Sequence, residues 1–517
     1  MFDFEKISAS KFYVAPTSER VVEFSPTDID MSNVARILSL AVDAKASSVD
    51  AQDGYAQVSG RVNFRLAYLD KEGTPKGVDY NADFTARVDG EFAEGDSAWS
   101  DVVISESDAA ASDTLTLTAV LEVAVSAIKR DEIEVLTGAD DCYVQKKEIY
   151  VPTFIAQKSV AVPFDDEKNV GGEIESVLGL STTVVPLKSL ATDGGANASL
   201  AVHATVTYAE GGQIKQHDFE IPLEEEFNLD GVLEGDAIKL CAVTKSSKVV
   251  LQGVTDDNTI RVEGEIQIRI QAFRCSKTEI ISDLFMLSNE TEIERKTAKY
   301  ECFDGCGYFI KGVGGSATLS DNKPAAIEVC ALPYARCYTT RAYVNDENSL
   351  IVEGVANTDI IYRDENGFNS VRAELPFAIS AASEIPFSKE VRVECRIQRI
   401  DAVVRREREF DITFDVAIAV CGFSPLEATY ISAVNVTTER AQNTSALSVY
   451  VATPSDTMLD VCAALSAMPD DILAQNPDLQ EPFAEDTKIV YFRALKQRSI
   501  GENKKERGAL PLSLLLI

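Results

Sequence analysis

Histidine is almost absent from this 517-residue sequence, which contains only His203 and His217. Metal sites built from several histidines are therefore excluded, and acid–base schemes that depend on histidine have little material. We expect both histidines to be structural, because His203 lies in a strand pattern and His217 stands beside Asp218. No apolar run reaches the ~18 residues of a membrane-spanning helix, so no transmembrane segment is expected.

Residues 1–6 have neither the basic nor the apolar region of a secretory signal, so we expect the protein to stay in the compartment where it is made.

Basic residues are also few. The 49 Lys and Arg stand against 83 Asp and Glu, which gives a net charge of −34. Nucleic acid and anionic membranes repel a molecule this acidic, so a nucleic-acid partner is not expected. At about 150 residues per domain, the length predicts three or four domains.

No catalytic motif is present in the sequence. It has neither a Gly-x4-Gly-Lys-Ser/Thr phosphate loop nor a Gly-x-Ser-x-Gly nucleophile elbow. The acidic clusters at 224–226 and 165–167 could be read as carboxylate pairs or calcium sites, but their spacing matches no calcium loop. We interpret them as solvated loop charge. The sequence therefore predicts a protein that is not an enzyme and has no cofactor.

The ten cysteines are scattered, and several fall at apolar positions of strand patterns, where a free thiol packs as a small hydrophobe. With no export signal, we expect them to be reduced. Cys302 and Cys306 form a C-x3-C pair with Cys330 and Cys337 downstream. A four-thiolate zinc site is the alternative, but the tight C-x2-C spacing is missing and no metal is predicted.

A domain-sized repeat is the main signal in the chain. Tyr68 and Tyr362 are each preceded by glycine at a distance of eight residues and followed by glycine at five, and Tyr208 marks a weaker copy. The spacings, 208−68 = 140 and 362−208 = 154 residues, are those of whole domains. Pro222 and Pro376 also fall at matching places in the second and third copies.

Each copy contains a long run in which apolar residues strictly alternate with polar ones, near 115–125, 260–270 and 410–420. Such runs are typical of antiparallel strands with one face in the core and one in water. In the third copy the apolar residues move from odd-numbered positions, up to Ile397, to even-numbered ones, from Ile400. This shift predicts a β-bulge near Arg399.

Six arginines at 392–408 are interleaved with acidic residues. We favour a cross-strand ion-pair surface there, with a docking face for an acidic partner as the alternative.

The predicted fold is mainly β, with three tandem antiparallel domains followed by a small βααβ domain. The ranges are 1–155, 156–300 and 301–434 for the β domains, 435–446 for a linker, 447–495 for the small domain and 496–517 for a tail. In the small domain, Asp456 is the expected N-cap of a helix that carries Met458 and Leu465. Residues 469–475 are expected to form a second short helix, and 488–492 a closing strand.

The small domain resembles a LysM domain. The likeness is carried by residues 453–458, Asp471-Ile472-Leu473 and Asn476-Pro477-Asp478-Leu479. Two departures stand out, since Ser455 replaces the usual glycine and the usual closing Gly-x-x-Leu-x-Ile-Pro is reduced to 486–491. The resemblance implies a groove between two loops, lined at the matching positions by Pro454, Ser455, Asp456, Thr457, Ile472, Asn476 and Pro477. Because Ser455 adds a side chain where a sugar would approach the backbone, a protein-binding surface is weighed equally with a glycan site.

The repeated β domains resemble the SPOCS (spore-coat-associated) domain, best in Val352-Glu353-Gly354 through Tyr362 and in Glu374-Leu375-Pro376-Phe377. Several such repeats before a C-terminal LysM domain is an arrangement similar to a family of coat morphogenetic proteins in endospore-forming bacteria. The resemblance implies a scaffold that is made in the mother-cell cytoplasm and localises to the forespore surface. Its implied partner is the basement-layer ATPase of the spore coat or another coat protein.

Two other functions stay open from the sequence. One is a binding protein for peptidoglycan or other N-acetylglucosamine polymers, such as chitin-type glycans, in the envelope or the cortex. The other, less favoured, is a hydrolase that uses carboxylates without a recognisable motif. The non-enzymatic scaffold, with a LysM-like module that makes protein–protein contacts, is the function that the sequence favours.

Overall fold

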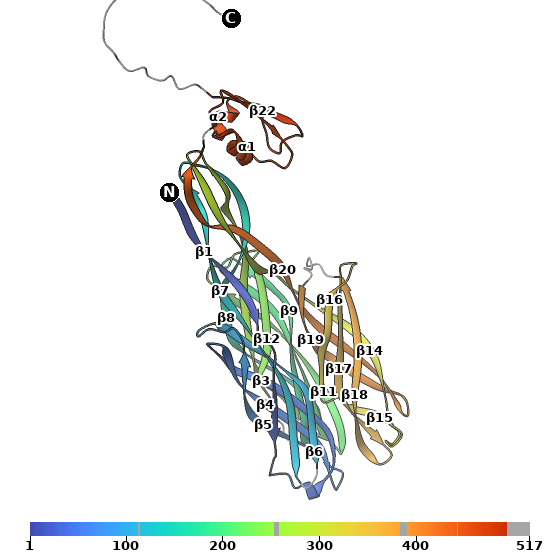
Figure 1. Cartoon of the computed structure of the whole chain (residues 1–517). Helices are drawn as coiled ribbons and strands as arrows, with labels where there is room; N and C mark the ends of the chain where they lie inside the picture. The colour runs from blue at the N-terminus through green and yellow to red at the C-terminus, as the bar shows by residue number, and fades with distance from the viewer. Residues whose placement is uncertain (112–113, 253–257, 383–389, 442, 494–517) are drawn as a thin grey trace, which may run out of the picture.

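The chain folds into an elongated, mainly β molecule, as the sequence predicts (Figure 1). This computed structural model describes residues 1–111, 114–252, 258–382, 390–441 and 443–493. Three β modules form the broad part of the molecule, and their longest strands continue into a narrower stalk. A small C-terminal unit lies at the tip of the stalk, close to the N-terminus. The predicted tail at 496–517 falls outside the described residues.

The three modules repeat one order of antiparallel strands. Module 1 is formed by β1 (Phe2–Val14), β2 (Ser18–Phe24), a 3-10 turn (Met31–Asn33), β3 (Val34–Gln52), β4 (Tyr55–Asp70), β5 (Pro75–Asp89), β6 (Ser97–Ala111) and β7 (Leu115–Ala139). Module 2 is formed by β8 (Cys142–Asn169), β9 (Ile174–Thr192), β10 (Gly195–Glu210), β11 (Gln213–Asn228), β12 (Ala237–Gln252) and β13 (Thr259–Met286). Module 3 is formed by β14 (Asn289–Thr318), β15 (Glu328–Ala331), β16 (Ala335–Val344), β17 (Ser349–Asp364), β18 (Gly367–Ala382), β19 (Glu390–Arg406) and β20 (Glu409–Glu439). The C-terminal unit is formed by β21 (Leu447–Ala452), α1 (Met458–Leu465), α2 (Pro469–Leu473) and β22 (Thr487–Phe492).

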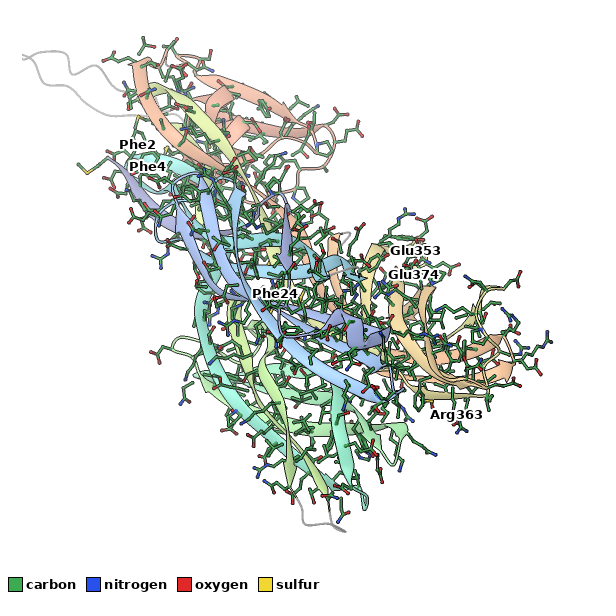
Figure 2. All side chains as sticks on the ribbon, turned by 90° about the horizontal axis from the view of Figure 1, so that it is seen from below. Phe2, Phe4, Phe24, Glu353, Arg363 and Glu374 are labelled. Atoms are coloured by element: carbon green, nitrogen blue, oxygen red, sulfur yellow. A yellow bond between two sulfur atoms is a disulfide. The ribbon has the colours of Figure 1, made fainter. Side chains whose placement is uncertain are left out.

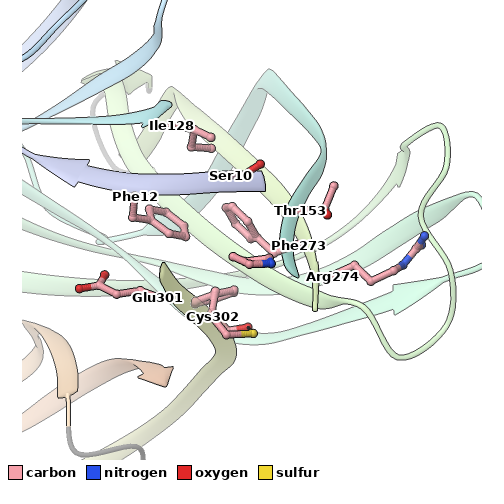
Figure 3. A pocket seen from close by; sticks show the side chains of 10 residues that line it. Ser10, Phe12, Ile128, Thr153, Phe273, Arg274, Glu301 and Cys302 are labelled. Carbon is pink, nitrogen blue, oxygen red and sulfur yellow. Dashed lines mark hydrogen bonds between the residues drawn. The ribbon is translucent and has the colours of Figure 1, made fainter. Parts of the chain in front are cut away.

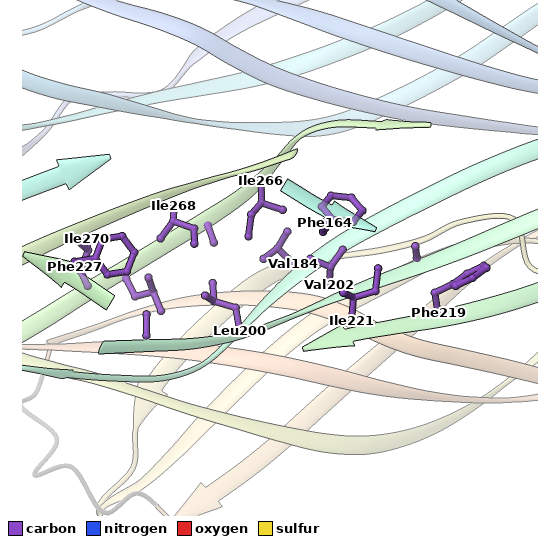
Figure 4. Close-up of a cluster of buried hydrophobic side chains, with 14 of the residues drawn as sticks. Phe164, Val184, Leu200, Val202, Phe219, Ile221, Phe227, Ile266, Ile268 and Ile270 are labelled. Atoms are coloured by element: carbon purple, nitrogen blue, oxygen red, sulfur yellow. The ribbon is translucent and has the colours of Figure 1, made fainter. Parts of the chain in front are cut away.

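Each module is a sandwich of two antiparallel sheets around one apolar core. In module 2, the sheet β9-β10-β11 faces the sheet β12-β13-β8. Leu200 and Val202 of the first sheet pack there with Ile266 and Ile268 of the second (Figure 4). The alternating runs supply these inward faces, because successive side chains of a strand point to opposite sides of the sheet. The long half-buried strands predicted from period-two alternation are confirmed as β7, β13 and β20.

The repeat markers lie at equivalent places in the three modules. Tyr68 and Tyr208 are on β4 and β10, the central strands of three-stranded sheets, and Tyr362 is on β17, the central strand of a four-stranded sheet. Pro222 and Pro376 are on β11 and β18, edge strands where the missing proline N–H breaks no interior ladder. The predicted bulge is also confirmed, since the register between β19 and β20 shifts between Ile397 and Arg399.

A glycine allows close packing in the central strands β4 and β17. Gly60 pairs with Phe84, and Gly354 pairs with Phe377. In both pairs the phenylalanine ring covers the glycine, so that a Cβ on Gly354 would lie 2.5 Å from Phe377 Cζ and 2.6 Å from the Tyr338 carbonyl oxygen. The ring therefore occupies the space that any larger residue at this position would need.

The stalk consists of three ribbons, one from each module. β1 pairs with the second half of β7, the first half of β8 with the second half of β13, and the first half of β14 with the second half of β20. At the tip of the stalk the chain passes from one module to the next, through residues 140–141 and 287–288. Divisions at 155/156 and 300/301 fall inside β8 and β14, and residues 435–439 of the expected linker belong to β20. Phe2 and Phe4 begin β1 beside the C-terminal unit (Figure 2).

The ribbons meet in a cluster of aromatic side chains at the base of the stalk, which we term the aromatic junction: Phe12, Trp99, Ile128, Phe154, Phe273, Phe303 and Phe423. Each ribbon contributes one cross-strand pair, namely Phe12–Ile128, Phe154–Phe273 and Phe303–Phe423. The ring centroid of Phe273 lies 4.8 Å from that of Phe12 and 5.1 Å from that of Phe303. Module association therefore depends on contacts between strands that are far apart in the sequence.

Polar contacts and a second apolar cluster also join the modules. Arg396 of module 3 donates to the carbonyl groups of Val184 and Ala242 in module 2, and its side chain is only 19% exposed. Leu38, Leu178 and Ile361, one from each module, pack in a common cluster with a few neighbours. The three sandwiches are thus held together by polar as well as apolar contacts.

Three sequence interpretations need correction. The acidic clusters at 224–226 and 165–167 lie in strands β11 and β8, not in loops, and Asp165 pairs with Arg261 at 2.8 Å. Most described arginines of the 392–408 group form ion pairs as expected, but Arg396 faces module 2 instead of solvent. Cys306 and Cys421 oppose each other on β14 and β20 and form a disulfide, so the expectation of free thiols is wrong for this pair.

We predict that Gly354→Ala lowers the free energy of unfolding by about 1–3 kcal/mol, because the added Cβ overpacks the Phe377 ring. Urea denaturation followed by circular dichroism measures the change. Gly314→Ala is the matched control, since the nearest atom to a Cβ there is 3.9 Å away. Equal stability of the two variants would contradict this account of the glycine.

We predict that Phe273→Ala costs about 3–5 kcal/mol, because truncation opens a cavity among rings from all three modules. Thermal unfolding of the full chain measures the loss. Val403→Ala, at a side chain that is 59% exposed on β19, should change stability by less than about 0.5 kcal/mol. A small effect of Phe273→Ala would mean that the aromatic junction does not hold the modules together.

Candidate functional site

The C-terminal unit is docked on the stalk through its own core. Met458, Val461 and Leu465 on α1 pack in one cluster with Phe285, the penultimate residue of strand β13 at the stalk tip. Arg440, between β20 and β21, stacks its guanidinium 4.7 Å from the centre of the Phe285 ring and donates to the Met286 carbonyl. The stalk therefore presents the unit at one end of the molecule.

The loop between β21 and α1 is tied by its own polar side chains. Asp456 accepts a hydrogen bond from the Thr453 backbone N–H at 2.8 Å, which lowers the pKa of its carboxyl. The Ser455 and Thr453 hydroxyls are 2.9 Å apart. The N-cap of α1 is Thr457 and not the predicted Asp456, because Thr457 and Asp460 form a capping box. Asp456 instead closes the turn before the helix.

Two of the predicted groove residues support the fold of the unit. Ile472 is completely buried in its core. The Asn476 side chain donates to the carbonyl groups of Ile472 and Val490 and accepts from the Val490 N–H, with all three distances between 2.8 and 3.0 Å. Asn476 therefore ties the end of α2 to β22, and both of its N–H donors are already used.

The remaining predicted groove residues lie at the surface. Pro454, Ser455 and Pro477 are exposed, and Asp456 and Thr457 are half-buried. The Met458 N–H donates to the Glu481 carboxylate, which brings the loop after α2 against the start of α1. This bond and the capping box satisfy donors at the start of α1 that an anionic ligand would otherwise bind.

The exposed large apolar side chains of the unit form a surface that the sequence reasoning missed. We term it the β21–β22 face, formed by Leu447, Val449, Val451 and Phe492, which are 50%, 54%, 48% and 61% exposed. Leu447 and Phe492 oppose each other across the strand pair, so all four side chains lie on one side of the sheet. The signal was present, because β21 is apolar on both faces, with Tyr450 and Ala452 on the side that packs against the core.

The charge of the unit is strongly negative. Residues 447–493 carry eight Asp and Glu and two basic residues, Lys488 and Arg493, for a net charge of −6. Burial and the nearby Asp456 carboxylate raise the pKa of Tyr450, and burial raises the pKa of Cys462 to about 12. Neither group therefore titrates near neutral pH. The unit presents a largely apolar face, with Lys488 opposite Val451, on an otherwise acidic surface.

Two hollows elsewhere in the molecule are poorer candidates for a ligand site. A cavity of about 10 Å³ lies at the aromatic junction between Phe12, Phe273 and Cys302, with room for about one water molecule (Figure 3). An open hollow of about 480 Å³ lies on module 2, and its charges are already paired, as in Lys248–Glu263 at 2.7 Å. Both are lined by groups that have partners in the fold or too little space for a ligand.

The cysteines considered as zinc ligands do not come together. Cys302 and Cys306 are on β14, Cys330 is on β15 and Cys337 is on β16. Cys302 is buried and hydrogen-bonds to Cys275, while Cys306 is bonded to Cys421. Within the described ranges, no group of three or more His, Cys, Asp or Glu is placed to hold a metal ion.

The two histidines lie in strands of module 2. His203 on β10 pairs with Glu220, and His217 on β11 packs edge-on against the Phe219 ring. Burial lowers the pKa of both imidazoles below the usual value. Both are therefore neutral at pH 7 and belong to the packing of the sheet.

No match was found when the chain was compared with protein-family models, curated proteins and solved structures. In the part of the chain that the structure describes, neither helix is long and apolar enough to cross a membrane.

We predict that Ile472→Ala lowers the local opening free energy of α1 by about 2–5 kcal/mol, since the side chain is buried in the core of the unit. Amide hydrogen exchange of the α1 peptide in the full chain measures this change. Val449→Ala is the control on the exposed face and should leave the exchange of α1 unchanged. If Ile472→Ala behaved like Val449→Ala, Ile472 would be a surface residue as the groove prediction required.

Proposed function

We propose that this chain is a non-enzymatic scaffold protein of the spore coat, which docks to a protein partner through its C-terminal unit. The residues that resemble SPOCS repeats and a LysM domain support the assignment to coat morphogenesis. The partner in this proposal is the basement-layer ATPase of the coat or another coat protein at the forespore surface, and the protein acts from the mother-cell cytoplasm.

The observation that carries the proposal is the β21–β22 face. Four large apolar side chains stand on one small sheet, and contiguous apolar patches on soluble proteins mark surfaces that other molecules cover. Phe492 is the natural anchor, because buried aromatic residues dominate the binding free energy of many interfaces. Burying one such side chain contributes about 1.5–3 kcal/mol.

The position of the unit suits a docking role. The Phe285 and Arg440 contacts hold it at the stalk tip, away from the broad end of the three modules (Figure 1). A partner bound there would meet little obstruction from the sandwiches. The modules would then act as a spacer that extends from the bound partner.

Protein binding is favoured over glycan binding by the state of the predicted groove. Ile472 and Asn476 are used in the fold, and the Ser455 hydroxyl is paired with Thr453. The surface that remains free is apolar, whereas an oligosaccharide site needs several polar groups directed at the ligand. A peptidoglycan-binding protein is therefore the second candidate, and the test below separates the two.

We predict that Val449→Ser combined with Phe492→Ser weakens binding of the full chain to the coat ATPase at least about tenfold, since two anchors are lost. Biolayer interferometry measures the affinity. Val403→Ser is the matched control, because Val403 is 59% exposed on β19, away from the unit. Retention on washed peptidoglycan that survives the double substitution and is lost in Ser455→Trp would establish the glycan function instead.

A further inference from the structure

We propose that the β21–β22 face is covered by a segment of the same chain, residues 509–517. This inference goes beyond the proposed function, because it identifies an intramolecular ligand for the face that any partner would have to displace. Its support comes from the chemistry of the face, the sequence of the segment, the distance along the chain and the distribution of charge.

The exposed side of this strand pair is apolar except for Lys488, which lies opposite Val451. Leu447, Val449 and Val451 are spaced two residues apart along β21, and Phe492 lies beside Leu447 on β22. Their exposure of 48–61% contrasts with the complete burial of Ile489 on the opposite side of the same sheet. A segment with apolar side chains at alternate positions would match this row.

Residues 510–514 have that pattern, and three further apolar residues follow them. The sequence Ala-Leu-Pro-Leu-Ser-Leu-Leu-Leu-Ile contains six large aliphatic residues and no charge. Leu510, Leu512 and Leu514 alternate with Pro511 and Ser513, which is the period of an extended strand with one apolar side. An apolar run this short cannot span a bilayer, which needs ~20 residues.

The segment is tethered close to the face. Phe492 belongs to the face, and Arg493 is followed by fifteen residues, 494–508, before Ala509. Fifteen residues reach up to about 50 Å when extended, and six-residue β21 is only about 20 Å long. A tether of this order gives an effective concentration in the millimolar range, which favours the chain's own segment over one from a second copy.

Charge favours the same arrangement. Residues 494–508 carry five basic residues, Lys496, Arg498, Lys504, Lys505 and Arg507, against Glu502 and Glu506, for a net charge of +3. The unit beside them has a net charge of −6. Opposite charges attract within a Debye length of about 8 Å at physiological salt. The tether therefore draws the apolar segment toward the unit.

The test uses a fluorescent reporter on the face. Phe492→Trp adds a tryptophan there, and the one native tryptophan, Trp99, is buried in the aromatic junction and contributes equally to every variant. The reporter is compared in the full chain and in a chain that ends at Gly508. We expect blue-shifted emission in the full chain and loss of that shift on truncation, because the segment removes the indole from water.

Substitutions within the segment provide matched controls. Leu512→Asp with Leu514→Asp should abolish the blue shift in the full chain, whereas Ser513→Asp, which adds charge but keeps every leucine, should retain it. Identical emission from the full and truncated chains would overturn the proposal. A blue shift lost on about a hundredfold dilution would also overturn it, because the occupant would then be a second copy.

The reporter decides this inference without any partner, so its failure is distinct from failure of the proposed function. Binding of the coat ATPase then provides the second measurement. If the segment covers the face, the chain that ends at Gly508 binds the ATPase more tightly than the full chain. Equal binding of both chains would contradict coverage of the face and leave the docking proposal intact.

Discussion

Contact between rings at the aromatic junction is the interaction on which the rest of the structure depends. Phe12, Phe273 and Phe303 come from three modules, and their ring centroids are separated by 4.8–6.3 Å. Each ring is fixed by a cross-strand partner within its own ribbon, so the cluster forms only when all three ribbons are correctly paired. The junction therefore links the register of each long strand to the association of the modules.

The same junction explains why the C-terminal unit has a defined place. Beyond the cluster the ribbons continue to the tip, where Phe285 reaches the core of the unit. Without aligned ribbons, Phe285 and Arg440 would not present one surface to α1. The position of the β21–β22 face thus follows from packing events at the far end of the stalk.

Much of the local structure could be predicted from the sequence, because it depends on neighbouring residues. Alternation identified β7, β13 and β20, and the parity change at Ile397 and Ile400 located the bulge. The stalk could not be found this way, since its cores join strands that lie more than a hundred residues apart. Register shifts lie near the transition at Ala272/Phe273 and Phe303/Gly305, but a similar shift at Ile397/Arg399 lies within a sandwich, so such a shift does not identify the start of the stalk.

In the candidate site, too, the features set by neighbouring residues were predictable and those set by packing were not. The order of strand, two helices and strand is local and was expected, but burial of Ile472 and exposure of Leu447 depend on how the elements pack. The N-cap was misplaced by one residue, because Asp456 and Thr457 are both capping residues and only the capping box with Asp460 separates them. The role of Arg396 between modules was hidden for the same reason, as a paired surface arginine has the same sequence pattern.

The direction of the strands at the tip has a mechanical consequence. β20 runs toward the C-terminal unit and is bonded along most of its length to antiparallel β14 and β19. Tension applied through the unit therefore pulls β20 parallel to its own axis, and loads many hydrogen bonds of the ladder at once in shear. Peeling a strand from its end would break those bonds one at a time. The molecule can therefore resist tension along its long axis, between the C-terminal unit and the broad end of the three modules.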